Sequence, residues 1–414
     1  MKTITANKTK ILNDPIYGFT NISHDLIFEL IEHPYFQRLR RISQLGLTYL
    51  VYPGANHTRF HHAIGAMHLM QKAVLTLKNK GHEITLEEEQ AVLIAILLHD
   101  IGHGPFSHAL EHSIVNSITH EDLSLMIMNK LNEEFEGKLS LAIQIFQNTY
   151  PKVFLHQLIS SQLDVDRLDY LKRDSFYCGV SEGIINSDRI INMLNIHHGN
   201  LVVDAKAIYS IEKFIIARRL MYWQVYLHKT VLSAEFSLVE ALKRAKTLIK
   251  KGDDIFCTSA LREFLEHNHS PENFNKNPKL LNLFCQLDDF DIMSSIKEWM
   301  QHPDKILSIL SKKIMERKLL KIELQDEKFN TSYIENIQHK ATEIYDIDSK
   351  NAPHLVFTNQ IDNKAYHPIK DKIYLLYKDG HIKDIGAASD QLNISVLGQT
   401  VTKHFLCYPK DCKI

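Results

Sequence analysis

The chain has 414 residues, of which 44% are hydrophobic and 23% are charged, and these values are typical of folded globular proteins rather than disordered or collagen-like chains. Lysine and arginine number 48 against 49 acidic residues, so net charge does not favour nucleic acid as the partner, nor a membrane surface. The longest aliphatic run, residues 91–98, is too short to span a bilayer. The first residues lack a signal-peptide core, and we expect a cytoplasmic protein with reduced cysteines.

Apolar side chains recur at helical spacing through most of the chain between residues 20 and 320. The stripes cover residues 25–46, 63–81, 86–100, 120–135, 156–175 and 207–252. Thr85 and Glu88 have the spacing of a capping box, which marks the start of a helix. Four glycines stand where helices should stop: Gly46, Gly81, Gly102 and Gly252. We therefore predict a mainly α-helical protein.

Strand-like segments are few and lie late in the chain. Residues 195–207 predict a short hairpin, and the pattern becomes strand-rich after about residue 350. There the pair Asp379-Gly380 is typical of a type I′ turn. We expect a helical catalytic domain over residues 1–330 and a small antiparallel α/β lobe over residues 331–414.

Histidine is unusually frequent, with 24 copies, and many of them lie between residues 57 and 120. The apolar helix ending in "LLHDIGHGPFSH" (97–108) places His99 and Asp100 at its end, and neighbouring residues on a helix cannot complete an ion's coordination alone. Imidazoles and carboxylates together suit a divalent ion with positions left open for catalysis. The alternative is a simple helix-end hydrogen bond. Further candidates come from other helices: His61, His62, Asp164, Asp166, Asp169 and Asp174.

Seven segments, in this order, resemble one family: the HD-domain deoxynucleoside triphosphate triphosphohydrolases. These comprise the bacterial dGTPases and the animal enzyme that adds a SAM domain to the same body. The segments are residues 14–18, 36–46, 52–65, 97–111, 119–124, 164–180 and 218–231. The resemblance covers about residues 14–235 and implies an HD-type helical body that hydrolyses nucleotides.

By this resemblance, one divalent ion (Mn, Fe, Zn, Ni, Co or Mg) is held by His62, His99, Asp100 and Asp166, while His61 is not expected to be a ligand. A second Mg²⁺ accompanying the substrate triphosphate is a further option. Asp166 is chosen over Asp164 because the family's ligand is the second aspartate of its D-V-D.

The implied reaction is attack of water on the α-phosphorus of a dNTP, which releases a deoxynucleoside and inorganic triphosphate. His108 matches the family's proton donor, and His103, Glu111 and His120 match residues around it. The match assigns the phosphates to Arg59, Arg167 and Arg218. The sugar and base side falls to Gln44, Leu45, Tyr170, Asp174, Tyr222 and Tyr226.

Within this set, Gln44 and Asp174 would bind the 3′-hydroxyl, and Tyr170 would exclude a 2′-hydroxyl. Tyr222 replaces a histidine of the animal enzyme, so the base preference stays open, although bacterial relatives often prefer dGTP.

Three residues fall where the animal enzyme binds an activating guanine nucleotide: Glu32, Gln37 and Arg40. The other interpretation is that this segment only packs and caps a helix. Family habit favours a homodimer or homotetramer. Two other functions compete with dNTP hydrolysis: an HD phosphodiesterase or phosphatase acting on other nucleotides, and a catalytically silent HD regulator that binds nucleotide or nucleic acid.

Overall fold

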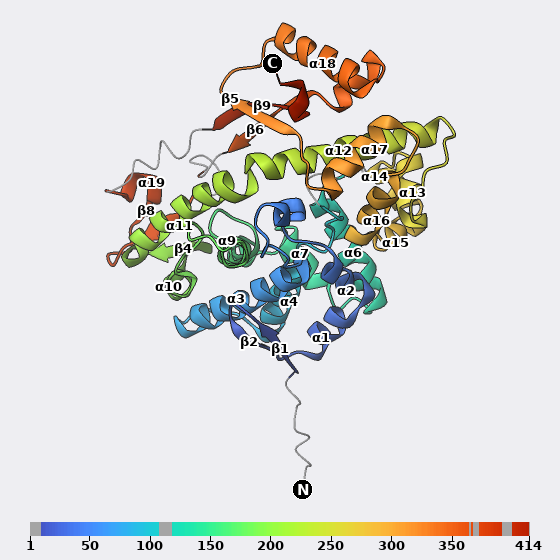
Figure 1. Cartoon of the computed structure of the whole chain (residues 1–414). Helices are drawn as coiled ribbons and strands as arrows, with labels where there is room; N and C mark the ends of the chain where they lie inside the picture. The colour runs from blue at the N-terminus through green and yellow to red at the C-terminus, as the bar shows by residue number, and fades with distance from the viewer. Residues whose placement is uncertain (1–9, 107–117, 364–365, 367–371, 391–399, 414) are drawn as a thin grey trace.

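The computed structural model describes residues 10–106, 118–363, 366, 372–390 and 400–413 (Figure 1). Helices make up most of the fold, as predicted, and strands are short. The first half contains β1 (Lys10–Asp14), β2 (Gly18–Ile22), α1 (Asp25–Glu32), α2 (Pro34–Gln37), α3 (Arg59–Asn79), α4 (Leu86–Leu98), α6 (His120–Glu134), α7 (Ser140–Phe146), α8 (Val153–Ile159), α9 (Val165–Cys178), α10 (Ser187–Asn192), β3 (Leu194–His197) and β4 (Asn200–Asp204).

The second half begins with α11, which leads through a π-helical turn, Tyr222–Tyr226, into the long helix α12. Its elements are α11 (Ile208–Met221), α12 (Lys229–Lys250), α13 (Ser259–Glu266), α14 (Pro271–Lys276), α15 (Pro278–Phe284), α16 (Asp289–Trp299), α17 (Lys305–Met315), β5 (Lys321–Gln325), α18 (Thr331–Tyr345), β6 (Phe357–Asn363), β7 (Tyr374–Leu376), β8 (Ile382–Asp384), α19 (Ile385–Ala388) and β9 (Val401–Tyr408).

Helix α4 lies at the centre of the helical body. From Ala91 to Leu98 every side chain is buried, so the helix is apolar on all sides rather than along one stripe. The predicted capping box begins it: the Glu88 amide donates to Thr85 Oγ1 at 3.2 Å, and the Thr85 amide donates to a Glu88 carboxylate oxygen at 2.9 Å. Its last turn therefore delivers the following residues, His99 and Asp100, into the protein interior.

Three of the predicted helical stripes each contain more than one helix: residues 25–46, 156–175 and 207–252. In the first, α1 ends at Glu32 before Pro34, which begins α2. Two local predictions are wrong. Gly46 does not end a helix; it has φ +49° and starts a 3₁₀ turn at Gly46–Leu50. The hairpin joining β7 and β8 has positive φ at Gly380 but not at Asp379, so a type I′ turn is excluded. Gly81 and Gly252 follow helix ends as predicted.

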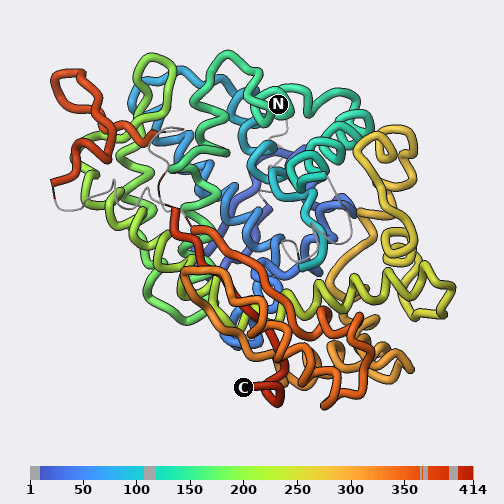
Figure 2. Tube along the Cα trace, turned by 90° about the horizontal axis from the view of Figure 1, so that it is seen from above, coloured from blue at the N-terminus to red at the C-terminus, as the bar shows by residue number. Residues whose placement is uncertain are grey.

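The C-terminal strands contribute to two different sheets. β5, β9 and β6 form an antiparallel sheet in which β9 is central, and Figure 1 shows it above α12 together with α18. β7 instead pairs in parallel with β4, so the predicted β3–β4 hairpin grows into the four-stranded sheet β3-β4-β7-β8. Seen from above, the two C-terminal parts lie at separate places on the body (Figure 2).

Helices α3 and α9 approach each other closely at Gly65. A Cβ added there would lie 2.0 Å from an Arg173 guanidinium nitrogen and 2.2 Å from a carboxylate oxygen of Asp169. Both of these α9 side chains are fully buried, so they have no free space into which to retreat. Glycine at this position is therefore required for the packing of the two helices.

We expect Gly65→Ala to lower the free energy of unfolding by about 1–3 kcal/mol, because the added methyl group overpacks a buried ion pair. Urea unfolding of both proteins measures this difference. Gly104→Ala is the matched control, since a Cβ there meets only ring carbons of Phe284 at 3.6 Å. Equal midpoints for the Gly65 variant and the unmodified chain would contradict the packing described above.

Candidate active site

Two imidazoles and two carboxylates from three helices converge at the end of α4. His62 comes from the first turns of α3, His99 and Asp100 follow α4, and Asp166 lies in the first turn of α9. The Asp166 Oδ1 atom is 3.0 Å from Nε2 of His62 and 3.4 Å from Nε2 of His99. Asp100 lies 3.4 Å from His99 and 3.8 Å from His62. Segments far apart in the chain thus form one compact donor set.

The hydrogen bonds of the two histidines assign their tautomers. Nδ1 of His62 lies 2.8 Å from the Asp169 carboxylate, and Nδ1 of His99 lies 2.6 Å from the Ile96 carbonyl. Each Nδ1 therefore carries a proton, which leaves the lone pair on Nε2. Both Nε2 atoms are buried, and neither has a hydrogen-bond partner among the described residues. Two imidazole lone pairs beside two carboxylates are the donors that a divalent cation would satisfy.

Behind His62 a chain of alternating charges continues into the core. Asp169 binds the Arg173 guanidinium at 2.9 and 3.0 Å, and Arg173 in turn reaches Asp14 at 2.8 Å. Burial opposes ionisation of Asp169, but Arg173 and His62 outweigh it and lower its pKa to about 2. Asp169 therefore stays ionised and fixes the ring of His62.

Asp164 and Asp166 stand two residues apart and have different surroundings. Asp164 accepts the Arg167 amide at 2.8 Å as the N-cap of α9, and its other oxygen forms an ion pair with the Arg167 guanidinium. Asp166 instead lies between the imidazoles of His62 and His99. His61 likewise is not in the cluster, because its Nδ1 closes the first turn of α3 with Thr58.

His103 and His120 form a second pair beside Asp100. Their rings stack at 3.9 Å between centroids, and His103 Nε2 lies 3.3 Å from Asp100 Oδ1. Burial and the neighbouring Arg59 cation keep the pKa of His103 well below its usual value, so this ring is uncharged at neutral pH. Two predicted residues lie within 107–117, outside the described part of the chain: His108 and Glu111.

The predicted phosphate-binding arginines already have neighbours. Arg59 donates to Asp100 Oδ2 at 2.5 Å and lines the cavity, as Arg167 does. The Arg218 guanidinium lies 6.0 Å from the Tyr222 ring centroid. Its Nε is buried and has no hydrogen-bond partner among the described residues, although Arg218 is not among the residues that line the cavity.

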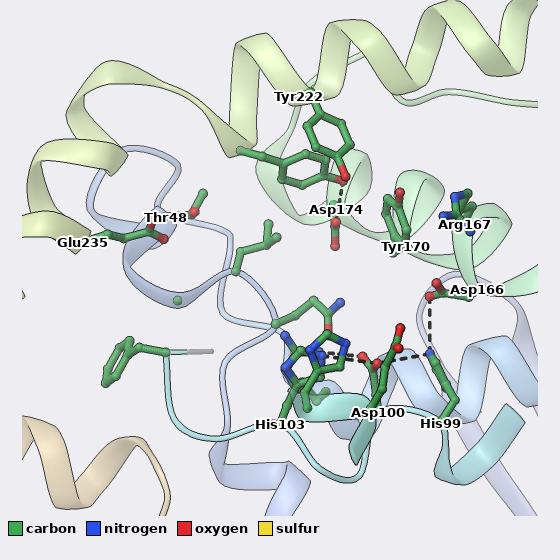
Figure 3. A pocket seen from close by; sticks show the side chains of 18 of the residues that line it. Thr48, His99, Asp100, His103, Asp166, Arg167, Tyr170, Asp174, Tyr222 and Glu235 are labelled. Atoms are coloured by element: carbon green, nitrogen blue, oxygen red, sulfur yellow. Dashed lines mark hydrogen bonds and ion pairs between the residues drawn. The ribbon is translucent and has the colours of Figure 1, made fainter. Parts of the chain in front are cut away.

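A cavity of about 1160 Å³ opens beside the cluster, large enough for a nucleotide (Figure 3). Asp174 on its wall accepts hydrogen bonds from His57 at 2.8 Å and from the Tyr226 hydroxyl at 2.7 Å. Tyr222 and Tyr226 project from the π-helical turn, a distortion frequent at functional sites. The predicted residues on the cavity wall are Gln44, Leu45, Arg59, His99, Asp100, His103, His120, Asp166, Arg167, Tyr170, Asp174, Tyr222 and Tyr226.

The three residues predicted for regulation lie together outside this cavity. Gln37 donates to the Ile31 carbonyl at 2.8 Å and accepts from Arg40 at 2.8 Å. The Arg40 guanidinium also stacks on Phe60 at 3.6 Å, and Glu32 is exposed. These contacts fit the packing interpretation, and nucleotide binding at this surface stays a prediction.

Sequence reasoning missed several residues that build the site. Three of them lie behind the residues that face the cavity: Asp14, His57 and Arg173. Their signal in the sequence was their place in three of the segments that carry the family resemblance, 14–18, 52–65 and 164–180. Glu235 also lines the cavity from α12. Its signal was an acid at helical spacing from Leu232 and Val239 within an apolar stripe.

Comparisons with known proteins match most of the chain to one family. Residues 59–174 match the HD domain, and residues 185–270 match the HD associated region. A phosphohydrolase from Bacteroides thetaiotaomicron has 50% identity and a TM-score of 0.94, covering 97% of this chain and 100% of its own. The uncharacterized protein YwfO of Bacillus subtilis is 31% identical over 98% of this chain and 93% of its own length.

A deoxynucleoside triphosphate triphosphohydrolase, the SAMHD1 homolog of Dictyostelium discoideum, is 30% identical over 71% of this chain and 63% of its own length. Among the described helices, none is long and apolar enough to cross a membrane. HD domains hold divalent metals, and the His/Asp group found above could hold one here. The chain therefore belongs to the HD-domain phosphohydrolases, in the family that includes the deoxynucleoside triphosphate triphosphohydrolases.

Proposed function

We propose that the chain is a metal-dependent triphosphohydrolase that cleaves a dNTP into a deoxynucleoside and inorganic triphosphate. One observation carries this proposal: a single cavity joins His99, Asp100 and Asp166 to a tyrosine and aspartate wall formed by Tyr170 and Asp174. A phosphatase acting on small phosphate esters does not need the second half of that cavity. A dNTP is long enough to use both halves.

In this proposal His62, His99, Asp100 and Asp166 hold the divalent ion. When bound, such an ion polarises the α-phosphate and makes a water molecule more acidic. The chain's own residues position the substrate around it: Arg59, Arg167 and Arg218 balance the negative triphosphate. Water adds to the α-phosphorus, the bond from that phosphorus to the 5′-oxygen breaks, and the 5′-oxygen takes a proton.

The proton is assigned to the histidines near Asp100. His108 is the proposed donor, supported by Glu111, and both lie outside the described part of the chain. His103 and His120 line the cavity. Imidazoles titrate near neutrality, which suits them to this transfer.

Sugar selection is assigned to the wall formed by the tyrosines and Asp174. Tyr170 and Tyr226 are edge to face with 6.2 Å between ring centroids, and Asp174 bonds to Tyr226. This packing fixes Tyr170 where we place the 2′ position of the sugar. Gln44 and Asp174 are proposed to bind the 3′-hydroxyl, with Leu45 beside the sugar.

We further propose that the enzyme prefers dGTP, is activated by a nucleotide bound near Glu32, Gln37 and Arg40, and works as a homodimer or homotetramer. A second Mg²⁺ would enter with the substrate triphosphate. Relatives named as dNTP triphosphohydrolases support a dNTP as the substrate, and these further points extend the family resemblance by analogy. Assays of dNTPs in pairs test activation, since an activated enzyme works with two nucleotides and is silent with one.

The reaction itself is tested by product analysis. We expect the purified chain with Mn²⁺ or Mg²⁺ to release inorganic triphosphate and deoxynucleoside in equal amounts from at least one dNTP. Chromatography of the products, with each dNTP alone and in pairs, measures this outcome. Release of orthophosphate or pyrophosphate would identify another hydrolase of the same fold, and no turnover under any of these conditions would contradict the proposal.

The ion ligands are tested by substitution. We expect His99→Ala and Asp166→Ala to lose bound metal and to lower turnover roughly a thousandfold or more, because the ion supplies several kcal/mol of barrier reduction. Metal analysis and circular dichroism should show an empty but folded protein. His61→Ala is the control, since His61 bonds to Thr58 and should keep the metal. Retention of metal by either ligand variant would remove that residue from the site.

The sugar wall is tested with Tyr170. We expect Tyr170→Ala to reduce the ratio of kcat/KM for dNTP over rNTP by about ten- to a hundredfold, since the ring no longer occupies the 2′ position. Tyr170→Phe keeps the ring and should keep the ratio. If rNTPs remain as poor for the alanine variant as for the unmodified chain, the sugar is selected elsewhere.

A further inference from the structure

Glu235 lies in the cavity but has no part in the mechanism above. Its helix, α12, forms the side of the cavity away from the ion ligands. In Figure 3, Glu235 and Thr48 lie at the opposite side of the cavity from His99 and Asp166. A substrate whose phosphates meet the ion ligands would therefore point its other end toward Glu235.

The carboxyl group of Glu235 sits against the loop that carries the proposed sugar contacts. A Cβ added to Gly46 would lie 3.4 Å from Oε1 of Glu235 and 3.8 Å from a ring carbon of Phe106. Gly46 directly follows Leu45, so this carboxyl is next to the position assigned to the sugar and base. Within the described part of the chain, Glu235 has neither a hydrogen bond nor an ion pair.

Leu45, Phe106 and Phe236 line the same cavity as Glu235, and Thr48 lies beside Glu235 in Figure 3. Lys243 also lines the cavity, but it is paired with Glu240 at 2.8 Å. Burial alone raises the pKa of Glu235 to about 8. At neutral pH the group is therefore mostly a neutral carboxylic acid, which offers one O–H donor and one carbonyl acceptor side by side.

We propose that Glu235 hydrogen-bonds the edge of the substrate's nucleobase and so determines which base the site accepts. This inference rests on the proposed dNTP hydrolysis. A base presents an N–H group beside a nitrogen or oxygen acceptor, and this edge pairs with a carboxylic acid through two hydrogen bonds. A phosphate group is the wrong occupant here, because among the described cavity residues the cation on the side of Glu235, Lys243, is already paired with Glu240.

Glu235 is half-buried, so water only partly replaces a missing hydrogen-bond partner. A base that fits pairs with both the donor and the acceptor of Glu235, whereas a base of the wrong shape leaves one of them unsatisfied. Loss of Glu235 should therefore change the ratios of kcat/KM among nucleotides and not the bond cleavage at the α-phosphorus. A residue that only supports the fold would instead affect all nucleotides alike.

The test compares kcat/KM for the four dNTPs between the unmodified chain and two variants. We expect Glu235→Ala to compress the range between the best and worst dNTP by about tenfold or more. We expect Glu235→Gln to keep the order of preference, because an amide also offers a donor beside an acceptor. Glu298→Gln, an exposed glutamate of α16, is the control and should change none of the ratios.

Three results would overturn this inference: equal losses for all four dNTPs in Glu235→Ala, an unchanged range in that variant, or no base preference in the unmodified chain. Bound metal and unfolding temperature are measured for each variant, so that a misfolded protein is recognised before kinetics are compared. If the unmodified chain hydrolyses no dNTP, the proposed function itself fails. If the unmodified chain hydrolyses dNTPs and Glu235→Ala keeps its kcat/KM ratios among them, only this inference fails.

Discussion

The hydrogen bond between His62 and Asp169 is the contact on which the site depends. It joins α3 to α9, and it leaves the lone pair of His62 facing Asp166 and Asp100. Burying the Asp169 carboxylate costs several kcal/mol unless it is paired, and Arg173 with Asp14 behind it provides that pairing. Strand β1, which carries Asp14, thus helps to orient His62 at the other end of this series of charged side chains.

The cavity has a charged end and a more apolar end, which are formed by different helices. Ion ligands and arginines gather where α4 ends and α9 begins, whereas α12 brings Glu235 and Phe236 among apolar side chains. The π-helical turn Tyr222–Tyr226 lies between α11 and α12 and supplies the tyrosines that separate the two ends. A nucleotide has the same polarity, with charge at the phosphates and a flat, mostly apolar base.

Sequence patterns predicted the helical class and most helix positions because apolar spacing and caps such as Thr85 with Glu88 are local properties. The four acids near α9 could not be told apart by spacing alone. Their roles depend on which face of α9 meets α3, and only the tertiary packing puts Asp166 in the cluster and Asp164 in a helix cap. Glu235 was missed for a related reason, since its significance comes from its place in the cavity and from having no polar partner among the described residues.

The packing also fixes the positions of two arginines of the site. Arg59 is held by Asp100 and Arg167 by Asp164, so both guanidinium groups are ordered in the absence of substrate. Ordered side chains lose less conformational entropy when a ligand binds. The same carboxylates offset part of each arginine charge, which fits a chain whose formal net charge is only −1. In the proposed function these guanidinium groups would orient the triphosphate as preorganised hydrogen-bond donors rather than through an overall positive field.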